Sequence, residues 1–335
     1  MVEKQRDKQL SILSILRSSE RPLSSSKIYE ELLALGYQIA ERTVRYYLKQ
    51  MEENGLTRAF GRRGHNITER GLTELDSRRT VERVGFLSAK IDQMTYRMIF
   101  DLTNKTGTIV ANITLVEPRE LAKRVEMICK VFEEGYALGR LVTLFEPGES
   151  VGHITVPEGM VGFGTVCSIT LNGVLLKYGV PTNSRFGGLL ELQGKRPIRF
   201  VEIITYEGTS IDPLEVFIRS GMTDYVGAIK TGNGRIGASF REFPSESCDL
   251  VEKLAQRLTR VGLGGFMRIG RTGQTLLEIP VSEGVVGAIV IGGLNPVSIL
   301  EETGVRAYSR ALAGLIDFNR LFCYEELESY LHAYV

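Results

Sequence analysis

The chain has 335 residues, with 41 Lys and Arg against 40 Asp and Glu and a formal net charge of +1. This length exceeds what one hydrophobic core usually serves, so we expect two or three domains. The charge is uneven, because residues 1–80 carry 15 basic against 11 acidic side chains and residues 81–335 carry 26 against 29. This modest asymmetry predicts a basic N-terminal part and excludes binding to nucleic acid through overall charge alone.

The cysteines and the apolar runs limit the location of the protein. The four cysteines form no Cys-x-x-Cys pair and lie far apart, at Cys129, Cys167, Cys248 and Cys323. They predict a reducing cytoplasm, with neither a disulfide framework nor a metal site. The longest apolar run, near 285–294, is interrupted by glycines, and the N-terminus mixes basic with acidic residues. We therefore expect neither a membrane span nor a signal peptide.

Two helices are predicted near the N-terminus. The first is indicated by leucines at helical spacing, Leu10, Leu13 and Leu16. The second follows candidate N-cap serines at 24–26 and carries apolar side chains at Ile28, Leu32, Leu33 and Leu35. Gly36 would end this helix, and the short turn to Ala40 is typical of a helix-turn-helix, in which the next helix is presented outward.

Residues 41–71 are the most informative segment, because a helix with two interleaved stripes is followed by a basic hairpin. One stripe is apolar and predicts a buried face, made by Val44, Tyr47, Leu48 and Met51. The other is exposed and largely cationic, and consists of Arg42, Arg45, Tyr46 and Lys49. Such a stripe suits the major groove of DNA, where Arg and Lys reach base edges and phosphates.

The hairpin completes the pattern of a winged helix-turn-helix. Residues 56–60 and 66–68 read as short strands around Gly61-Arg62-Arg63-Gly64, and Thr68 would cap a last short helix. We predict a DNA-binding domain over residues 1–80, with contacts from Arg42, Thr43, Arg45, Tyr46, Lys49, Arg62 and Arg63. Two alternatives stay open, a solvated basic surface and a winged helix that contacts only protein.

From about residue 84 the chain repeats itself at a separation near 125 residues. The segment from Val156, VPEGMVGFGTVCSITLNGVLLKYGV, returns from Ile279 as IPVSEGVVGAIVIGGLNPVSILEETGV. Predicted helices precede the two copies, over 120–135 with an apolar face at Leu121, Val125, Ile128 and Phe132, and over 248–262 with one at Leu250, Leu254 and Leu258.

Each half reads strand, helix, strand, strand, helix, which predicts two similar halves related by a pseudo-twofold axis. The strand IVANITL alternates apolar and polar residues, whereas GAIVIGG is apolar throughout, so helices should cover the sheet at least partly. The predicted fold class is a multidomain α+β protein, in which a winged helix precedes an internally duplicated α/β domain. That domain covers 85–335, in halves of about 85–195 and 196–335, and the seam between them is a natural ligand cleft.

Three short segments offer polar groups to an anionic small molecule. Residues 206–213, YEGTSIDP, combine hydroxyl groups with a helix start, although a plain capping turn is the alternative. Residues 182–185 add an arginine suited to a carboxylate, and residues 164–168 add further hydroxyls. No segment completes a dinucleotide or phosphate-loop motif, and no nucleophile stands beside a base. We therefore predict that the protein is not an enzyme and holds no cofactor.

Together these residues resemble a known family, the NrpR nitrogen-regulatory repressors of methanogenic archaea and some bacteria. The resemblance covers nearly the whole chain and rests on the winged helix followed by GFGTVCSITLNGVLLKYGVP, RFGGLLEL and ITYEGTSIDPLEVFI. It implies a dimeric transcriptional repressor that binds palindromic operators of nitrogen-assimilation genes and is released by 2-oxoglutarate. Many family members carry two copies of the regulatory body, whereas this chain carries one.

The implied dicarboxylate effector should enter a cleft in the body and change the spacing of two recognition helices. We predict its contacts at Thr165, Cys167, Ser168, Arg185, Tyr206, Thr209 and Ser210, and a packed apolar side chain is the alternative for Cys167. Two other functions stay open. One is a regulator whose body docks another protein or binds a different metabolite, and the other is an enzyme fused to a DNA-binding head.

Overall fold

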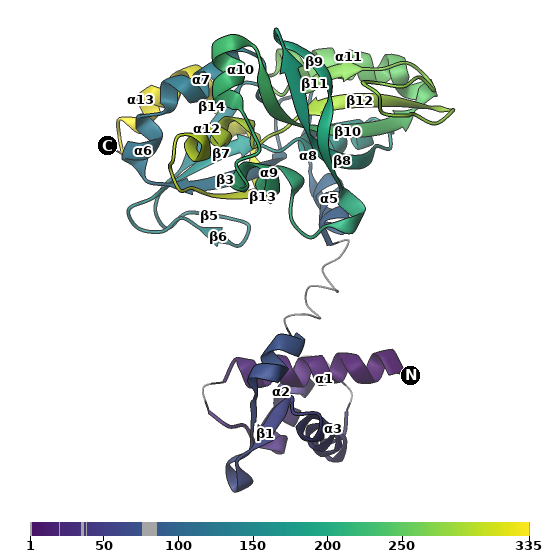
Figure 1. Cartoon of the computed structure of the whole chain (residues 1–335), viewed down its shortest axis with the longest axis vertical. Coiled ribbons are helices and arrows are strands. Elements are labelled where there is room, and N and C mark those ends of the chain that lie inside the picture. Colours follow the sequence, from purple (N-terminus) through teal and green to yellow (C-terminus); the bar gives the residue numbers. More distant parts are fainter. Residues whose placement is uncertain (1, 20, 35–36, 38, 76–85, 335) are drawn as a thin grey trace. The chain divides into compact units, whose positions relative to one another are not determined.

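The computed structural model describes residues 2–19, 21–34, 37, 39–75 and 86–334. It divides into two compact units, Met1–Val84 and Gly85–Val335 (Figure 1). Within the described ranges, no helix is long and apolar enough to cross a membrane.

The N-terminal unit folds as a winged helix, as predicted. Its three main helices are α1 (Val2–Arg17), α2 (Ser25–Ala34) and α3 (Glu41–Glu53). The wing strands β1 (Thr57–Ala59) and β2 (His65–Ile67) pair antiparallel, each within about a residue of its predicted position. A bridge joins Leu23 to His65 through N–H to carbonyl distances of 3.0 and 2.9 Å, so a third segment extends this small sheet.

Local capping explains where the short helices begin. The Ser24 hydroxyl accepts the Lys27 N–H at 3.3 Å and so caps α2, and the Thr68 hydroxyl accepts the Gly71 N–H at 3.0 Å at the start of helical residues 69–75. Helix α3 has no side-chain cap at Ala40. The predicted helix end at Leu35 and Gly36 lies outside the described residues.

Within the described residues, the larger unit contains two five-stranded antiparallel sheets. The first has the order β13-β3-β7-β4-β14 and is formed by β3 (Thr108–Val116), β4 (Leu141–Phe145), β7 (Val161–Val166), β13 (Tyr308–Asp317) and β14 (Phe322–Cys323). The second has the order β11-β12-β10-β8-β9 and is formed by β8 (Asn183–Gln193), β9 (Arg196–Thr205), β10 (Gly234–Pro244), β11 (Phe266–Ile269) and β12 (Val285–Ile291). A small hairpin consists of β5 (Ser150–Val151) and β6 (Ile154–Thr155).

The sequence repeat reappears as a repeated strand order, β4-β7-β3-β13 in one sheet and β11-β12-β10-β8 in the other. The last strand of each copy, however, pairs in the sheet of the opposite copy. Strand β8 follows the first copy but pairs with β10, and β13 follows the second copy but pairs with β3. The copies therefore exchange their last strands, and one hydrophobic core runs through both.

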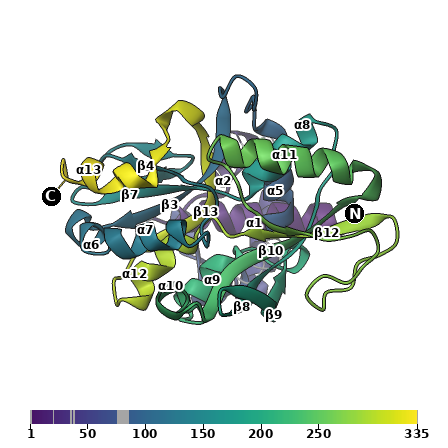
Figure 2. The same ribbon diagram turned by 90° about the horizontal axis from the view of Figure 1, so that it is seen from above.

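Helices pack against both sheets. In Figures 1 and 2, α6, α7 and α13 lie with the first sheet and α11 lies along β11 and β12. The helices of this unit are α5 (Phe86–Arg97), α6 (Pro118–Ala122), α7 (Val125–Glu133), α8 (Ile169–Lys177), α9 (Pro213–Arg219), α10 (Tyr225–Thr231), α11 (Cys248–Arg260), α12 (Ser298–Glu302) and α13 (Leu327–Leu331). Short 3-10 turns occur at η1 (Gly61–Arg63), η2 (Tyr206–Gly208), η3 (Ser245–Ser247), η4 (Asn295–Val297), η5 (Phe318–Arg320) and η6 (Tyr324–Glu326).

Two predicted apolar positions are wrong in detail. Leu33 of α2 is 45% exposed and Leu250 of α11 is 37% exposed, because each lies one residue beyond the stripe that is buried. On α11 the buried side chains are Val251, Leu254 and Leu258. The helix predicted over 120–135 is also divided, into α6 and α7. At the break, the Arg124 guanidinium reaches the Thr303 hydroxyl at 3.2 Å, a long-range contact that helical spacing cannot reveal.

The alternation of apolar and polar residues in strand β3 does not correspond to a face exposed to solvent. Asn112 and Thr114 are each 1% exposed, although they occupy the polar positions of IVANITL. The hydroxyl groups of Thr114 on β3 and Ser309 on the exchanged strand β13 are hydrogen-bonded at 2.9 Å. The polar positions are buried because the second copy covers this face, and they are satisfied by hydrogen bonds within the seam.

Candidate functional site

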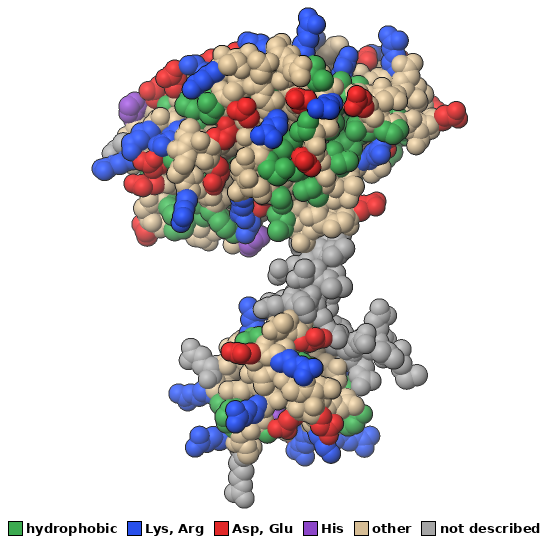
Figure 3. Space-filling model, in the orientation of Figure 1, with side chains coloured by type: hydrophobic (Ala, Val, Ile, Leu, Met, Phe, Trp, Pro, Cys, Tyr) green, Lys and Arg blue, Asp and Glu red, His purple; other side chains and the backbone are tan. Residues whose placement is uncertain are grey.

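The first candidate site is the outer face of α3. Arg42, Arg45 and Lys49 are exposed, Tyr46 is 54% exposed, and Thr43 is half-buried. The predicted apolar stripe is buried on the opposite side of the helix, at Val44, Tyr47, Leu48 and Met51. Figure 3 shows Lys and Arg side chains gathered where Figure 1 places α3. The predicted recognition stripe is therefore open to solvent.

Arg45 is oriented by both helices of the motif. Its Nη2 lies 2.8 Å from Glu41 Oε1 on α3, and its Nε donates to Ser25 Oγ on α2 at 3.2 Å. The arginine side chain stays 66% exposed and the glutamate 36% exposed, so this ion pair contributes only about 0–1 kcal/mol. A phosphate or base edge, which offers a charge-assisted hydrogen bond, can replace Glu41 without a large loss of stability.

The wing places further cations beside this helix. Arg63 is exposed at its tip, while the side chain of Arg62 lies outside the described part of the chain. Gly64 has a φ of +107°, and an added Cβ would meet the Leu23 carbonyl oxygen at 2.1 Å, so only glycine permits this close approach. Arg58 on β1 is another exposed cation, which the sequence interpretation did not name.

The second candidate site is a small cavity at the seam of the body. It measures about 10 Å³ and is lined by Asn112, Cys167, Ser168, Tyr206, Asp212, Leu214, Ser239, Gly292, Gly293, Leu294 and Ala311. Such a volume suits about one water molecule. Equivalent positions of the repeat meet here, because Cys167 and Ser168 follow β7 as Gly292 and Gly293 follow β12. The cavity therefore lies where the two copies converge.

Four of the predicted ligand residues gather at this cavity. Cys167, Ser168 and Tyr206 line it, and Thr165 lies beside it, where its hydroxyl accepts from Asn112 Nδ2 at 3.2 Å. Burial raises the pKa of the Cys167 thiol to about 11, so this side chain is an uncharged thiol at neutral pH. Burial likewise raises the pKa of the Tyr206 hydroxyl. These groups offer hydrogen bonds and no charge.

The other three predicted ligand residues lie elsewhere. Arg185 lines a separate groove of about 350 Å³, and its Nη1 lies 2.9 Å from the Glu242 carboxylate. The Thr209 hydroxyl accepts the Ile211 N–H at 3.1 Å and donates to the Ile211 carbonyl at 2.8 Å, so it stabilises its own loop. Ser210 belongs to the same loop and does not line the cavity.

The most buried charge at the seam, Arg241 on β10, was missed from the sequence. Arg241 is 1% exposed, and its Nη1 and Nη2 donate to the Ser168 carbonyl at 2.9 Å and the Ser168 hydroxyl at 2.7 Å. Nη1 also donates to Asn172 Oδ1, and Nε has no hydrogen-bond partner. Burial lowers the pKa of this guanidinium. The available signal was the spacing of Ser239 and Arg241, which places two polar side chains on the same face of the strand.

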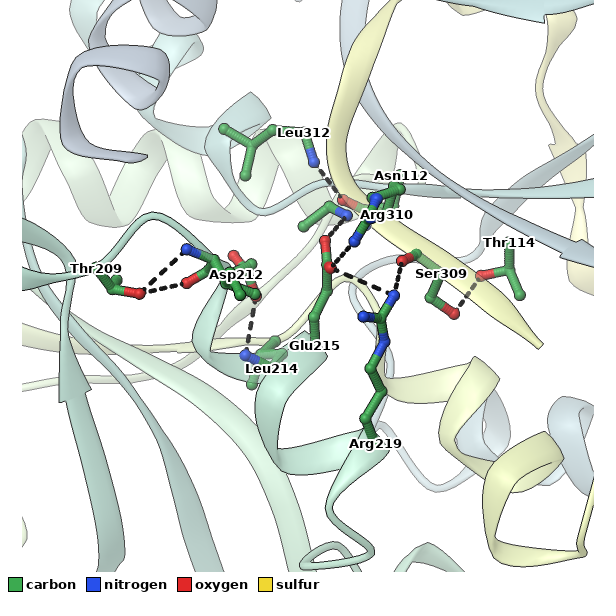
Figure 4. A network of polar contacts seen from close by, with 12 residues as sticks. Asn112, Thr114, Thr209, Asp212, Leu214, Glu215, Arg219, Ser309, Arg310 and Leu312 are labelled. Carbon is green, nitrogen blue, oxygen red and sulfur yellow. Dashed lines mark hydrogen bonds and ion pairs between the residues drawn. The ribbon is translucent and has the colours of Figure 1, made fainter. Parts of the chain in front are cut away.

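Two acidic side chains lie at the start of α9, where Asp212 lines the cavity and Glu215 belongs to the polar network of Figure 4. Asp212 caps α9, where its Oδ1 accepts the Leu214 N–H at 2.9 Å. Burial raises the pKa of Asp212 to about 7, and the neighbouring charge of Glu215 acts in the same direction. Glu215 is 5% exposed and is bonded to the Arg310 guanidinium at 2.9 Å and the Ala311 N–H at 2.6 Å. Glu215 therefore has a cation as its partner.

Another hollow of the body, of about 490 Å³, is a poor anion site. It is lined by Asp224, Glu301 and Glu302 among other residues. Glu302 accepts the backbone N–H groups of Tyr225 and Val226 at 2.9 Å, so it caps α10. In the part of the chain that the structure describes, no group of three or more His, Cys, Asp or Glu could hold a metal ion.

Both units match known protein families. Residues 84–322 match the family described as NrpR regulatory domains NRD1 and 2, and residues 10–75 match the ribonuclease R winged-helix domain. The chain is 33% identical to the global nitrogen regulator NrpRI of Methanosarcina mazei. The aligned 314 residues cover 94% of this chain and 97% of that protein.

Two longer relatives are also similar. The global nitrogen regulators NrpR of Methanococcus maripaludis and Methanocaldococcus jannaschii are 30% and 32% identical over 93% and 87% of this chain. The matches span 54% and 50% of those proteins, about half of each. The crystal structure of a nitrogen repressor-like protein from Methanococcus jannaschii shares the fold over 70% of this chain and 97% of that one, with a TM-score of 0.60 and 23% identity.

Proposed function

Because this chain belongs to the NrpR family of nitrogen regulators, we propose that it represses nitrogen-assimilation genes by binding palindromic operator DNA as a cytoplasmic dimer, and that 2-oxoglutarate releases it. Membership of the family makes the chain a transcriptional regulator of nitrogen metabolism rather than an enzyme. DNA recognition and the response to an effector are the two parts of the proposal that need direct tests.

The observation that carries the DNA-binding part is the open cationic face of α3. Arg42, Arg45 and Lys49 project from a helix whose opposite face is fully buried, so the helix is held while its cations stay available. Two such helices in a dimer must lie about 34 Å apart to read successive half-sites. The effector part is supported by the cavity, in which hydroxyl groups of both copies converge.

The decisive experiment is sequencing of the DNA that is bound to the protein in chromatin, followed by binding to the recovered sites in vitro with and without 2-oxoglutarate. Arg45→Ala should weaken operator binding about 5- to 150-fold, because a base contact is worth about 1–3 kcal/mol. Binding by the unchanged protein should fall steeply with added salt. Arg199→Ala on β9 is the matched control, because that arginine is exposed but lies in the body.

Two results would contradict the proposal. Normal operator binding by Arg45→Ala would remove α3 from the interface. Operator binding that is insensitive to 2-oxoglutarate would favour a regulator whose body docks another protein or binds a different metabolite, and pull-downs from cells grown with and without ammonium would distinguish these two.

A further inference from the structure

The ends of two helices of the body carry exposed apolar side chains. Tyr96, in the last turn of α5, is 83% exposed, and Ile99, two residues after this helix, is 61% exposed. Leu176 and Tyr178, at the end of α8, are exposed as well. Single apolar side chains on a surface are ordinary, but a group of them is typical of a site that contacts another protein. We call these four residues the helix-end patch.

The two helix ends are held together as one surface. The Lys177 Nζ, between the two α8 members of the patch, donates to the backbone carbonyls of Ile99 and Phe100 at 3.1 and 3.0 Å. Helices α5 and α8 lie side by side in Figures 1 and 2. They pack closely, since a Cβ added to Gly173 of α8 would collide with the Met98 side chain. The patch is therefore a firm surface that can dock without rearrangement.

The rim of the helix-end patch is polar and carries charges of both signs. Arg97 and Asp101 flank Ile99 along the chain, and the Arg257 guanidinium of α11 lies 5.4 Å from the centre of the Tyr178 ring. An apolar centre within a polar rim is the usual anatomy of a protein interface. The opposite charges of Arg97 and Asp101 suit a surface that meets a copy of itself, because each can face the other across a twofold axis.

A second exposed apolar surface, on β9, is less suited to association between copies. Ile198 and Ile203 are exposed there, and β9 is the edge strand of its sheet. Its pairing with β8 shifts register twice, however, and the strand contains Pro197. Bulges and proline are features by which an edge strand avoids pairing with another chain. The helix-end patch is therefore the better candidate.

The position of the patch on α5 identifies a second copy of this chain as its partner. Helix α5 begins at Phe86, the first described residue of the body, and Tyr96 lies about 15 Å along it at about 1.5 Å per residue. Two α5 helices in contact at their ends, about 10 Å apart, would place the two Phe86 residues no more than about 40 Å from each other. The winged helices of the dimer are attached beside these residues, and their recognition helices must lie about 34 Å apart.

We propose that the helix-end patch is the surface through which two copies of this chain associate, with the twofold axis close to Ile99. The inference rests on the proposed function, because it names the surface through which the proposed dimer forms. In such a contact the same surface of both copies is used, so that each patch covers the other. Tyr96 and Ile99, the most exposed members of the patch, then become its buried centre.

Sedimentation equilibrium of the full chain tests the contact with two variants of opposite charge. Ile99→Asp and Ile99→Lys should each raise the Kd of the dimer about 30-fold or more, because like charges then meet in an apolar centre. An equimolar mixture of the two variants should restore the dimer, because unlike charges then face each other, and misfolded variants could not give this result. Ile203→Asp is the matched control, because Ile203 is a 50% exposed isoleucine on β9, and it should dimerise as the unchanged protein does.

Each outcome decides between the interface and the function. Restoration of the dimer by the mixture supports the inference. If both Ile99 variants dimerise as tightly as the unchanged protein, or if Ile203→Asp alone separates the copies, the inference is wrong and the proposed function stands. If the mixture stays monomeric, the patch does not meet a copy of itself and the inference is overturned.

Two further results concern the proposed function. If the dimer forms through the helix-end patch but does not bind operator DNA, the inference stands and the DNA-binding part of the proposed function is wrong. If the unchanged chain is a monomer that binds its operator, both the inference and the proposed dimer are wrong.

Discussion

Arg45 of the winged helix and Arg241 of the body are placed in opposite environments. Arg45 on α3 is 66% exposed and makes an ion pair that water can replace, whereas Arg241 is 1% exposed at the centre of the body. An exposed guanidinium keeps its hydration, so its substitution should change binding to a partner and leave stability nearly unaffected. A buried guanidinium has lost its hydration and must be compensated within the fold or by a ligand.

The body contains an arginine with an acidic partner and another for which the described residues supply no ion pair. Arg310 forms an ion pair with the buried carboxylate of Glu215, whereas the hydrogen-bond partners of Arg241 are the neutral groups of Ser168 and Asn172. Removal of Arg310 should therefore destabilise the fold, because the carboxylate of Glu215 would lose its cation. Substitutions at these residues test the difference.

The largest expected effect comes from breaking the ion pair of Arg310 with Glu215, whose side chains are 35% and 5% exposed. Arg310→Met leaves Glu215 with the Ala311 N–H and with Arg219, whose Nη2 is 3.9 Å away. Leaving one buried charge without its partner lowers the free energy of unfolding by about 3–5 kcal/mol, and the remaining contacts favour the lower end. Urea denaturation measures this loss. Arg199→Met removes an exposed ion pair with Glu191 and should lower the free energy of unfolding by only about 0–1 kcal/mol. Equal losses in the two variants would contradict the contrast.

A smaller, pH-dependent effect is expected at Asp212, which faces Glu215, Lys90, Tyr206 and Arg241 at the seam. Its pKa of about 7 in the fold exceeds the ordinary value for aspartate, so between these pH values the folded chain binds more protons than the unfolded chain. Stability should therefore fall as the pH rises from about 4 to about 7. The contribution is on the order of 1–3 kcal/mol, because one pKa unit is worth about 1.4 kcal/mol and partial exposure reduces the effect.

Asp212→Asn removes this titration and keeps the cap of α9, since asparagine also accepts the Leu214 N–H. Thermal unfolding from pH 4 to pH 8 should show the variant gaining stability relative to the unchanged protein as the pH rises. Parallel curves for the two proteins would mean that Asp212 ionises as it would in water.

The smallest effect is expected in the winged helix. Glu41→Gln removes the ion pair that orients Arg45, and an exposed pair of this kind on a helix contributes about 0.3–0.5 kcal/mol. Stability should therefore change little, while operator binding should be unchanged or slightly tighter, because a negative charge is removed beside the recognition stripe. Anisotropy titrations with operator DNA measure this change. A large loss of stability would show that Arg45 is part of the folded structure in the way that Arg310 is.

How far the sequence predicts each site depends on the distance over which its residues interact. The stripes of α3 were predicted to the residue, because helical periodicity is local and Val44, Tyr47, Leu48 and Met51 need only a small core. The cavity was predicted in part, because Cys167, Ser168 and Tyr206 belong to polar segments that stand out in an apolar chain. Thr209 stands out equally well, but its hydroxyl is used within its own loop.

The sequence by itself determined the winged helix, the cationic stripe and the duplication. Each of them depends on the spacing of residues along the chain, which can be read without knowing how distant segments pack. Only the tertiary structure decided that the copies exchange β8 and β13, since strand partners are selected by packing between distant segments. It also decided that Arg241 meets Ser168 and Asn172, which precede it by 73 and 69 residues. A buried charge shows its partners only when the chain has folded, because the groups that replace its lost water come from elsewhere in the sequence.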